Sequence, residues 1–318
     1  MKAAAITEFG GPENIQLLDL PDPLVGPDIV LVRAAAAGVN PADWKIREGR
    51  MTSRYPHVFP LILGWDVSGV VEAVGAAVTA FRPGDRVCAY ARKFCIGHGC
   101  YAEYVAVVEE SVSPAPRSAD LVGAAALPLA SLTALQTIYA LEVISGESVL
   151  IHGGSGGVGS FAVQLLVDMG ATVLATASPA SAGHLESMGA VPIDRTGDIV
   201  RQVQAVTPDG VHAVMDVGGG PDAIRTSMPV TRDGGRIASI LGPPELNDED
   251  LARGLKGRYV FVRPYGAQLA DLVAKVDAGS LRIPVFETFP LEQASEAHRR
   301  LEAGGVRGKI ALTVGDGQ

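Results

Sequence analysis

The chain has 318 residues, with 26 Lys and Arg against 35 Asp and Glu, so its formal net charge is −9. The length favours two domains, and the negative charge argues against nucleic acid or an anionic membrane as a partner. No apolar run spans a membrane, no signal-peptide core begins the chain, and three cysteines are too few for a disulfide framework, so we expect a cytoplasmic globular protein.

The first 120 residues predict an antiparallel β domain. Short runs of strand-forming residues are separated by Gly and Pro, as at Gly26-Pro27 and Pro83-Gly84. Such punctuation is typical of strands joined by tight turns. The predicted strands cover residues 29–37, 67–74, 86–90 and 102–108.

A strand, a glycine-rich turn and a helix follow one another in the middle of the chain. Residues 148–152 are an apolar strand, GGSGGVG follows, residues 158–169 have a helical pattern, and 171–177 predict a second buried strand. Glycines spaced G-x-G-x-x-G allow the tight turn, the close approach of a pyrophosphate and helix packing on the sheet. This spacing predicts a dinucleotide site at Gly154, Ser155, Gly156, Gly157, Val158 and Gly159.

Four further apolar runs complete a predicted six-stranded sheet. Predicted helices separate most of them, which is the pattern of a doubly wound parallel sheet of the Rossmann type. Ligands of such sheets bind beside the carboxyl ends of the strands, where Val217, Leu241 and Val262 lie. The strands cover 190–193, 212–217, 236–241 and 259–262, and the helices 180–188, 198–206 and 221–230.

The second predicted strand lacks the acidic residue of an NAD site. An Asp or Glu at its end usually binds the adenosine ribose, but this chain has Thr176-Ala177-Ser178-Pro179. Ser178 and Ser181 can donate hydrogen bonds to a 2′-phosphate, so we expect NADPH as cofactor. The candidate cations are His184, whose alternative is a solvated helix position, and Arg307 or Lys309 if the C-terminus folds back.

The last fifty residues are expected to rejoin the first domain. The six-stranded sheet is already complete at residue 262, and a helix at 267–278, strands at 285–289 and 309–314 and a helix at 291–303 remain. We therefore predict a substrate domain of residues 1–122 and 267–318, and a cofactor domain of residues 123–266.

Six blocks of sequence, in this order, are similar to one family. They are AGVNPAD (37–43), GWDVSGVVEAVG (64–75), GDRV (84–87), YAEY (101–104), GGSGGVG (153–159) and RGK (307–309). The chain resembles the zinc-independent medium-chain dehydrogenases/reductases, and most of all their NADPH:quinone oxidoreductase (zeta-crystallin-like) branch. The resemblance implies a GroES-like substrate domain, a Rossmann domain, NADPH as hydride donor, and a homodimer paired through the strand near 259–262.

The residues that bind zinc in related alcohol dehydrogenases are replaced. Those relatives carry a cysteine where Asn40 stands and a His-Glu pair where Trp65-Asp66 stands, and an amide and an indole do not replace a thiolate and an imidazole. Cys95-x-x-His98-x-Cys100 offers three ligands without a fourth; the alternative is a thiol-bearing loop. We therefore expect no metal.

Without a metal, we expect the protein to reduce only hydride acceptors that are reactive by themselves. A quinone or another conjugated carbonyl spreads the charge that a hydride brings, so the protein mainly orients it. Asn40 is the first candidate to contact the acceptor or the nicotinamide ribose, and its alternative is capping the turn before Pro41. Tyr55 is a candidate proton donor or a packing residue. Two alternatives to quinone reduction remain open. The first is an enoyl reductase that acts on an acyl thioester or an enone. The second is a non-catalytic NADPH-binding protein, either crystallin-like or a sensor.

Overall fold

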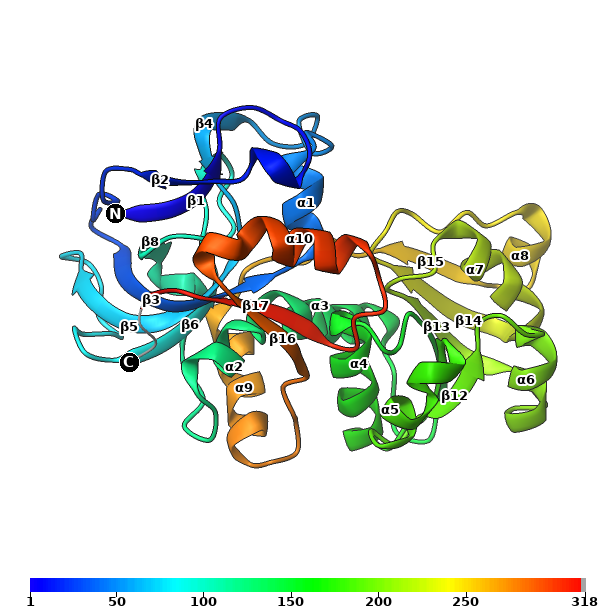
Figure 1. The fold of residues 1–318 in the computed structure, drawn as a ribbon. Helices are drawn as coiled ribbons and strands as arrows, with labels where there is room; N and C mark the ends of the chain where they lie inside the picture. Colours follow the sequence, from blue (N-terminus) through cyan, green and yellow to red (C-terminus); the bar gives the residue numbers. More distant parts are fainter. Residues whose placement is uncertain (316–318) are drawn as a thin grey trace. The chain divides into compact units, whose positions relative to one another are not determined.

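The computed structural model describes residues 1–315, which form two compact units (Figure 1). The first unit contains Met1–Leu129, Pro264–Gly279 and the chain from Ile283 onward. The second unit contains Ala130–Arg263 and Ser280–Arg282.

The first unit is built on two β-sheets. The larger has the order β16-β17-β3-β5-β6-β9, with β8 also paired to β3, and the smaller has the order β2-β1-β4-β7. Most pairs are antiparallel, while β16–β17 and β4–β7 are parallel. The strands are β1 (Lys2–Ile6), β2 (Gln16–Asp19), β3 (Ile29–Val39), β4 (His57–Ile62), β5 (Asp66–Val74), β6 (Arg86–Tyr90), β7 (Ile96–His98), β8 (Tyr104–Val108), β9 (Val112–Pro114), β16 (Val285–Pro290) and β17 (Lys309–Thr313).

The C-terminal segment completes the larger sheet. Strand β17 lies between β16 and β3, so segments about 270 residues apart in sequence are side by side (Figure 1). The helices of this unit are α1 (Pro41–Arg47), α2 (Leu121–Ala125), α9 (Gly266–Asp277) and α10 (Ala294–Glu302), with 3₁₀ turns at Pro12–Asn14, Glu109–Ser111 and Leu291–Gln293.

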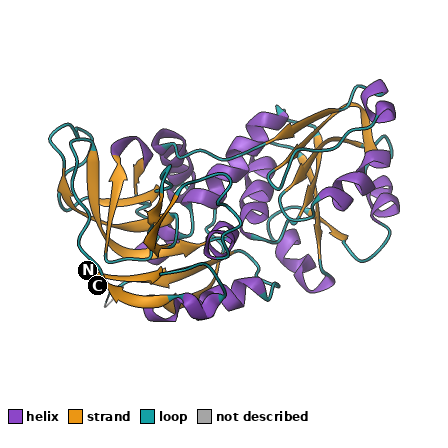
Figure 2. Cartoon of the chain, turned by 90° about the horizontal axis from the view of Figure 1, so that it is seen from above, coloured by secondary structure: helices purple, strands orange, loops and turns teal. Residues whose placement is uncertain are grey.

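The second unit is a parallel sheet with helices on both faces (Figure 2). Its six strands run in the order β12-β11-β10-β13-β14-β15, which is the doubly wound order with a reversal beside the first strand. The strands are β10 (Ser148–His152), β11 (Thr172–Ala177), β12 (Val191–Asp194), β13 (Val211–Asp216), β14 (Thr231–Ser239) and β15 (Lys256–Tyr259). The predicted fold class, a GroES-like β domain with a six-stranded Rossmann sheet, is confirmed.

Helices pack their apolar sides on this sheet. Buried aliphatic residues such as Leu150, Val214 and Ile237 form its core with Val203 and Ile224 of the covering helices. The helices are α3 (Pro128–Leu141), which begins in the first unit, α4 (Gly157–Asp168), α5 (Ala182–Glu186), α6 (Ile199–Val206), α7 (Pro221–Ser227) and α8 (Asp248–Ala252), with 3₁₀ turns at Pro179–Ser181 and Met228–Val230.

Most predicted elements are present, and some differ at their ends. Strands 148–152 and 86–90 match β10 and β6 to the residue, whereas β15 ends three residues before the predicted 262. Predicted helix 180–188 is divided into a 3₁₀ turn that begins at Pro179 and the helix α5. Among residues 1–315, no helix is long and apolar enough to cross a membrane.

Candidate functional site

The glycine-rich turn has the geometry of a phosphate cradle. Strand β10 ends at His152, and Gly153 turns the chain with φ +83°, a conformation that favours glycine. The Gly154 amide then donates to the Thr176 carbonyl of β11 at 3.1 Å, and α4 begins at Gly157. The free amides at the start of α4 and its positive dipole end therefore face outward from the carboxyl end of the central strands, where an anion is stabilised.

The second and third glycines of the motif, Gly156 and Gly159, differ in how closely other atoms surround them. A Cβ on Gly159 would lie 2.2 Å from the Gly153 oxygen and 2.6 Å from the Gly154 Cα, so this glycine permits helix α4 to pack against the turn. A Cβ on Gly156 would meet only the Gly153 oxygen, at 3.5 Å. The protein itself thus leaves space at Gly156. Residues Ser155, Gly157 and Val158 beside it are half-buried, so the cradle is open to a ligand.

A buried histidine, His152, lies directly before the glycine-rich turn and contacts the residues that hold it. The His152 Nε2 lies 2.6 Å from the Ser227 hydroxyl, and its Nδ1 lies 3.4 Å from the Thr176 hydroxyl. The Gly153 amide also donates to that Thr176 hydroxyl, at 3.2 Å. Burial lowers the pKa of His152 to about 4, so the ring is neutral at pH 7 and accepts or donates as its partners require.

The loop after β13 is ordered by one carboxylate. The Oδ1 of Asp216 accepts hydrogen bonds from the amides of Gly218, Gly219 and Gly220 at 3.3, 2.8 and 3.1 Å, and its Oδ2 accepts one from the Ser239 hydroxyl at 3.0 Å. Sequence reasoning missed Asp216. The three residues predicted to line the cofactor, Val217, Leu241 and Val262, follow the carboxyl ends of β13, β14 and β15, and all three are at least partly exposed.

The end of β11 carries hydroxyl groups. The Ser178 and Ser181 hydroxyl oxygens lie 3.3 Å apart, just beyond Ala177. His184 instead places its Nε2 3.2 Å from the Ser160 hydroxyl of α4.

A cation that sequence reasoning missed lies beside this strand end. Arg195 is exposed, and its amide donates to the Ala177 carbonyl at 3.0 Å because β12 is the neighbour of β11. The order of a doubly wound sheet places the third strand beside the second, so this arginine was detectable from the sequence. Asp194 lies next to it, but its Oδ1 accepts hydrogen bonds from the Thr196 amide and hydroxyl.

In the first unit, Asn40 lies in a buried polar cluster. Its amide nitrogen donates to the Asp66 Oδ2 at 2.8 Å and to the Gly38 carbonyl at 3.4 Å, and its Oδ1 accepts a hydrogen bond from Lys309. The Lys309 ammonium also donates to the Val39 carbonyl at 3.0 Å and lies 3.6 Å from the Asp66 Oδ2. Both amide hydrogens of Asn40 therefore have acceptors within the protein, and Asn40 is also the N-cap residue of α1, in a capping box with Asp43.

The Asp66–Lys309 pair is almost completely buried. Asp66 has 0 % and Lys309 has 4 % of its surface exposed. Burial raises the pKa of Asp66 and lowers that of Lys309, while each charge opposes the shift of the other. The Leu129 amide adds a hydrogen bond to the Asp66 Oδ1 at 2.8 Å. Lys309 is thus engaged inside the first unit, whereas Arg307 is exposed before β17; their roles at a cofactor phosphate stay predictions.

Tyr55 belongs to an aromatic group in the same unit. Its hydroxyl accepts a hydrogen bond from Arg92 at 2.5 Å, and its ring meets Trp65 edge-on with centroids 6.2 Å apart. Trp65 also contacts Tyr90, at 6.0 Å between centroids. Two further aromatic residues of this unit make other contacts: the Trp44 ring packs against the charged groups of Lys45 and Arg50, and the Phe59 ring packs on Phe9.

The three cysteines do not form a metal cluster. Cys95 is exposed, while Cys88 and Cys100 are buried, and burial raises the pKa of both buried thiols. Within residues 1–315, no three His, Cys, Asp or Glu side chains are arranged to hold a metal ion.

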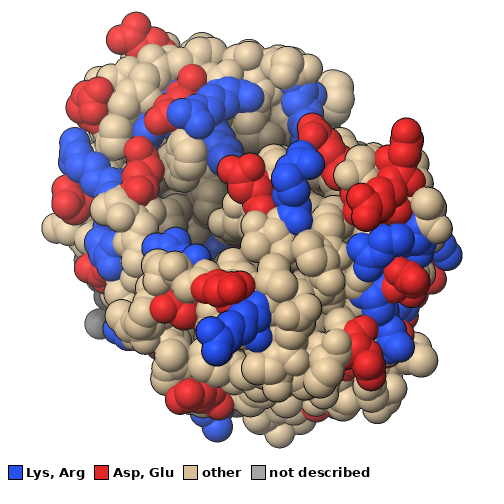
Figure 3. Space-filling view, turned by 90° about the vertical axis from the view of Figure 1, so that its right-hand side faces the viewer, with Lys and Arg blue, Asp and Glu red and all other residues tan. Residues whose placement is uncertain are grey.

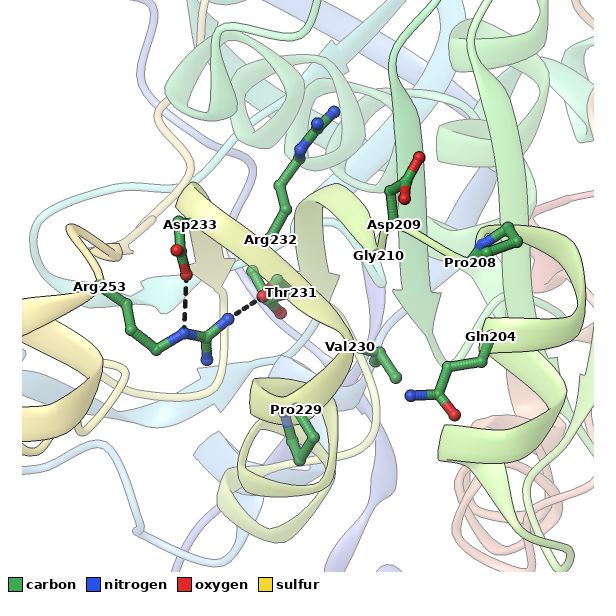
Figure 4. A pocket seen from close by; sticks show the side chains of 10 residues that line it. All are labelled: Gln204, Pro208, Asp209, Gly210, Pro229, Val230, Thr231, Arg232, Asp233 and Arg253. Atoms are coloured by element: carbon green, nitrogen blue, oxygen red, sulfur yellow. Dashed lines mark hydrogen bonds and ion pairs between the residues drawn. The ribbon is translucent and has the colours of Figure 1, made fainter.

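A cavity of about 430 Å³ opens elsewhere on the second unit (Figure 4). It lies at the amino ends of β13 and β14, the edge of the sheet opposite to the glycine turn, and Arg253 on its wall is bound to Asp233 at 2.9 Å. Dinucleotides bind at the carboxyl ends of such strands, so this cavity is not the cofactor site. On the face shown in Figure 3, acidic and basic side chains are interspersed.

Comparison with known proteins agrees with this geometry. Residues 26–117 match the alcohol dehydrogenase GroES-like domain, and residues 188–312 match the zinc-binding dehydrogenase family model. The chain is 32% identical to the quinone oxidoreductase of Sus scrofa over 99% of this chain and 98% of that protein. It belongs to the medium-chain dehydrogenase/reductase family.

Two further medium-chain dehydrogenases/reductases show the range of relatives. The chain is 32% identical to the chloroplastic NADPH-dependent alkenal/one oxidoreductase of Arabidopsis thaliana, over 98% of this chain and 79% of that protein. A solved structure of an NAD-dependent alcohol dehydrogenase has a TM-score of 0.90 and 32% identity, covering 99% of this chain and all of that one. Family membership makes this protein an oxidoreductase, and the predicted resemblance to the quinone oxidoreductase branch is confirmed.

Proposed function

We propose that the protein transfers a hydride from NADPH to a quinone or a similar conjugated carbonyl. The observation that carries this proposal is the open strand–glycine–helix cradle at Ser155–Val158 in a chain similar to quinone oxidoreductases. When bound, the reduced nicotinamide supplies the hydride. The amides at the start of α4 bind the pyrophosphate, and Val217, Leu241 and Val262 line the cofactor.

The preference for NADPH over NADH rests on the end of β11. No carboxylate stands at Ser178, and Ser178 and Ser181 present two hydroxyls to a 2′-phosphate. We propose that Arg195 supplies the positive charge, because its backbone amide is bound to the Ala177 carbonyl just before Ser178 and its side chain is exposed. A guanidinium binds a phosphate through charge-assisted hydrogen bonds, which a ribose without the phosphate does not provide. Similarity to both NADPH-dependent and NAD-dependent relatives makes this preference the first point to test.

We infer that the buried polar cluster of the first unit helps to hold the hydride acceptor in place. Asn40, Asp66 and Lys309 join strands β3, β5 and β17 through direct contacts, which fixes the backbone from which Asn40 projects. Positioned groups of this kind lower the barrier by holding the acceptor in a reactive orientation. We propose that Asn40, whose side chain is bound within the protein, contributes to this orientation by fixing the backbone, and that the dimer and the cytoplasmic location follow those of the branch.

The proposal is tested by following NADPH absorbance with a panel of quinones and enones. Oxidation that depends on a quinone and prefers NADPH over NADH by tenfold or more in kcat/KM is expected. If NADPH binds but no acceptor drives its oxidation, catalysis is excluded and a non-catalytic binding protein is the better description.

Enone reduction is the second candidate. The similarity to an alkenal/one oxidoreductase favours it, and so does the Tyr55 hydroxyl held by Arg92, since enone reduction needs an acid to protonate carbon. The Tyr55→Phe variant separates the two functions. Loss of enone turnover with unchanged quinone turnover would assign the proton to Tyr55.

A further inference from the structure

A buried carboxyl group next to Asn40 has no part in the function proposed above. Asp43, in the first turn of α1, has no exposed surface. Its Oδ2 accepts hydrogen bonds from the Asn40 amide at 2.8 Å and from the Tyr101 hydroxyl at 2.9 Å. Its Oδ1 is buried without a hydrogen-bond partner among the described residues. Protonation at Oδ1 therefore leaves both existing hydrogen bonds in place.

A chain of hydrogen bonds with a fixed direction leads to this carboxyl. The Arg47 NH1 lies 3.2 Å from the His298 Nδ1, and the His298 Nε2 lies 3.2 Å from the Tyr101 hydroxyl. A guanidinium only donates, so the His298 Nδ1 accepts and its Nε2 carries the hydrogen. Nε2 then donates to the Tyr101 oxygen, and the single Tyr101 hydrogen points at Asp43. Burial near Arg47 lowers the pKa of His298 to about 3, which keeps the ring neutral.

This chain of hydrogen bonds orients the Asp43 carboxyl group and does not carry protons to it from the solvent. Arg47 also donates to the Glu302 Oε1 at 2.7 Å and to the Gly10 carbonyl at 2.9 Å, which holds its guanidinium in place. An arginine keeps its charge in proteins, so no proton enters His298 through it. The proton of Asp43 is thus held at Oδ1, on the side of the carboxyl that the chain leaves unbonded.

The charge of the surrounding cluster depends on that proton. Asp66 and Lys309 contribute one negative and one positive charge, so the cluster is neutral while Asp43 is protonated and has a charge of −1 when Asp43 ionises. Burial raises the pKa of Asp43 to about 7, with Asp66 raising it further and the Tyr101 and Asn40 hydrogen bonds and Lys309 lowering it. The titratable and charged groups that face Asp43 are Asp66, Tyr90, Cys100, Tyr101 and Lys309, with His298 and Arg47 behind Tyr101.

We propose that Asp43 is a positioning residue whose proton keeps the buried cluster behind Asn40 neutral, and that hydride acceptance is faster in this neutral state. The inference rests on the proposed function. A hydride brings two electrons to the acceptor, which becomes an anion, and water then supplies the proton that neutralises the product. Asp43 keeps its own proton throughout. An ionised Asp43 opposes the negative charge that develops on the acceptor.

The expected size of this effect is measurable. At an effective dielectric constant of about 20, repulsion between two separated like charges changes a rate roughly tenfold. We therefore expect kcat/KM for the quinone to fall about tenfold as the pH rises from 6 to 8.5.

Asp43→Asn provides the direct test, because asparagine keeps the accepting oxygen and is never ionised. In this variant kcat/KM should stay level from pH 6 to 8.5 and exceed the wild-type value at pH 8.5. Asp19→Asn, an exposed change in β2 of the same unit, should retain the wild-type profile. A level wild-type profile, or an unchanged fall in Asp43→Asn, would overturn the proposal.

Tyr101→Phe gives a second readout if Asp43→Asn folds poorly. Loss of the Tyr101 hydrogen bond removes a contact that favours the ionised carboxylate, so the fall in kcat/KM should move to higher pH. A purely structural role of Tyr101 would lower the rate equally at every pH, which would contradict the proposal.

A stability measurement separates this inference from the proposed function. The folded-state pKa of Asp43 lies above its unfolded value of 3.8, so the folded wild type binds an extra proton and loses stability as the pH rises from about 4 through 7. The Tm of the wild type should therefore fall relative to Asp43→Asn across this range. A constant difference in Tm in an active enzyme overturns the Asp43 proposal alone, whereas a wild type that oxidises no NADPH overturns the proposed function.

Discussion

Replacing the second and the third glycine of the motif by alanine, one at a time, should separate cofactor binding from folding. Gly156 has an ordinary φ of −76°, and its new Cβ would lie 3.5 Å from the nearest heavy atom, the Gly153 oxygen. An alanine fits there, and the free energy of unfolding should change by no more than about 1 kcal/mol. At Gly159 the Cβ would lie 2.2–2.7 Å from backbone atoms of Gly153 and Gly154, and overpacking of this kind costs roughly 1–3 kcal/mol or more.

The two variants should therefore differ in a way that no general loss of stability reproduces. If the pyrophosphate approaches the backbone at Gly156, Gly156→Ala should weaken NADPH binding by about tenfold to a hundredfold, which is about 1.4–2.8 kcal/mol, with a nearly unchanged Tm. Gly159→Ala should lower both the Tm and the affinity. Tm is measured by thermal unfolding, and affinity by titrating NADPH fluorescence.

A matched control is available in the first unit. Gly26→Ala introduces the same methyl group, at 3.4 Å from the Ile29 side chain, and should leave both quantities unchanged. Wild-type NADPH affinity in a folded Gly156→Ala protein would refute the assignment of the cradle.

Three other changes test separate parts of the site. Arg195→Ala should raise KM for NADPH about tenfold with little change for NADH, because only NADPH carries the 2′-phosphate, and an equal rise for both cofactors would exclude Arg195 from that role. Tyr55→Phe should leave NADPH-dependent quinone reduction within about twofold of wild type, and a large loss with quinones would show that the phenol serves them too. Gly64→Ala should cost at least about 2 kcal/mol in denaturant unfolding, because its φ is +88° and its Cβ would lie 2.2 Å from the Tyr101 ring; a smaller loss would mean that this ring moves easily.

The elements best predicted from the sequence are those with a strong local signal. The buried strand at Ser148–His152 and its glycine turn combine apolar residues with three glycines at fixed spacing, and the structure reproduces both. Helix α3 was not predicted, because most of its residues are buried on all sides of the helix and no periodic contrast between faces marks it. Strand β4 was also missed, since Pro60 lies inside it and proline is unfavourable in most strands.

The polar contacts of the first unit depend on residues far apart in the chain. The family resemblance singled out Asn40, but nothing local indicates that Lys309 and Asp66 bind its amide group, because 269 and 26 residues separate them from it. Asp43 in α1, Tyr101 in the loop between β7 and β8, and His298 in α10 are likewise far apart in the chain. The sheet order, with β17 next to β3, brings Lys309 to Asn40.

The position of β17 also has a consequence for synthesis of the protein. Strand β3 is complete early in translation, yet its neighbour β17 and the Lys309 that balances Asp66 emerge about 270 residues later. The second unit, which is nearly contiguous in the chain, can fold first during this interval. Until then the nascent first unit exposes an unpaired strand edge, and such edges are prone to pair with other chains.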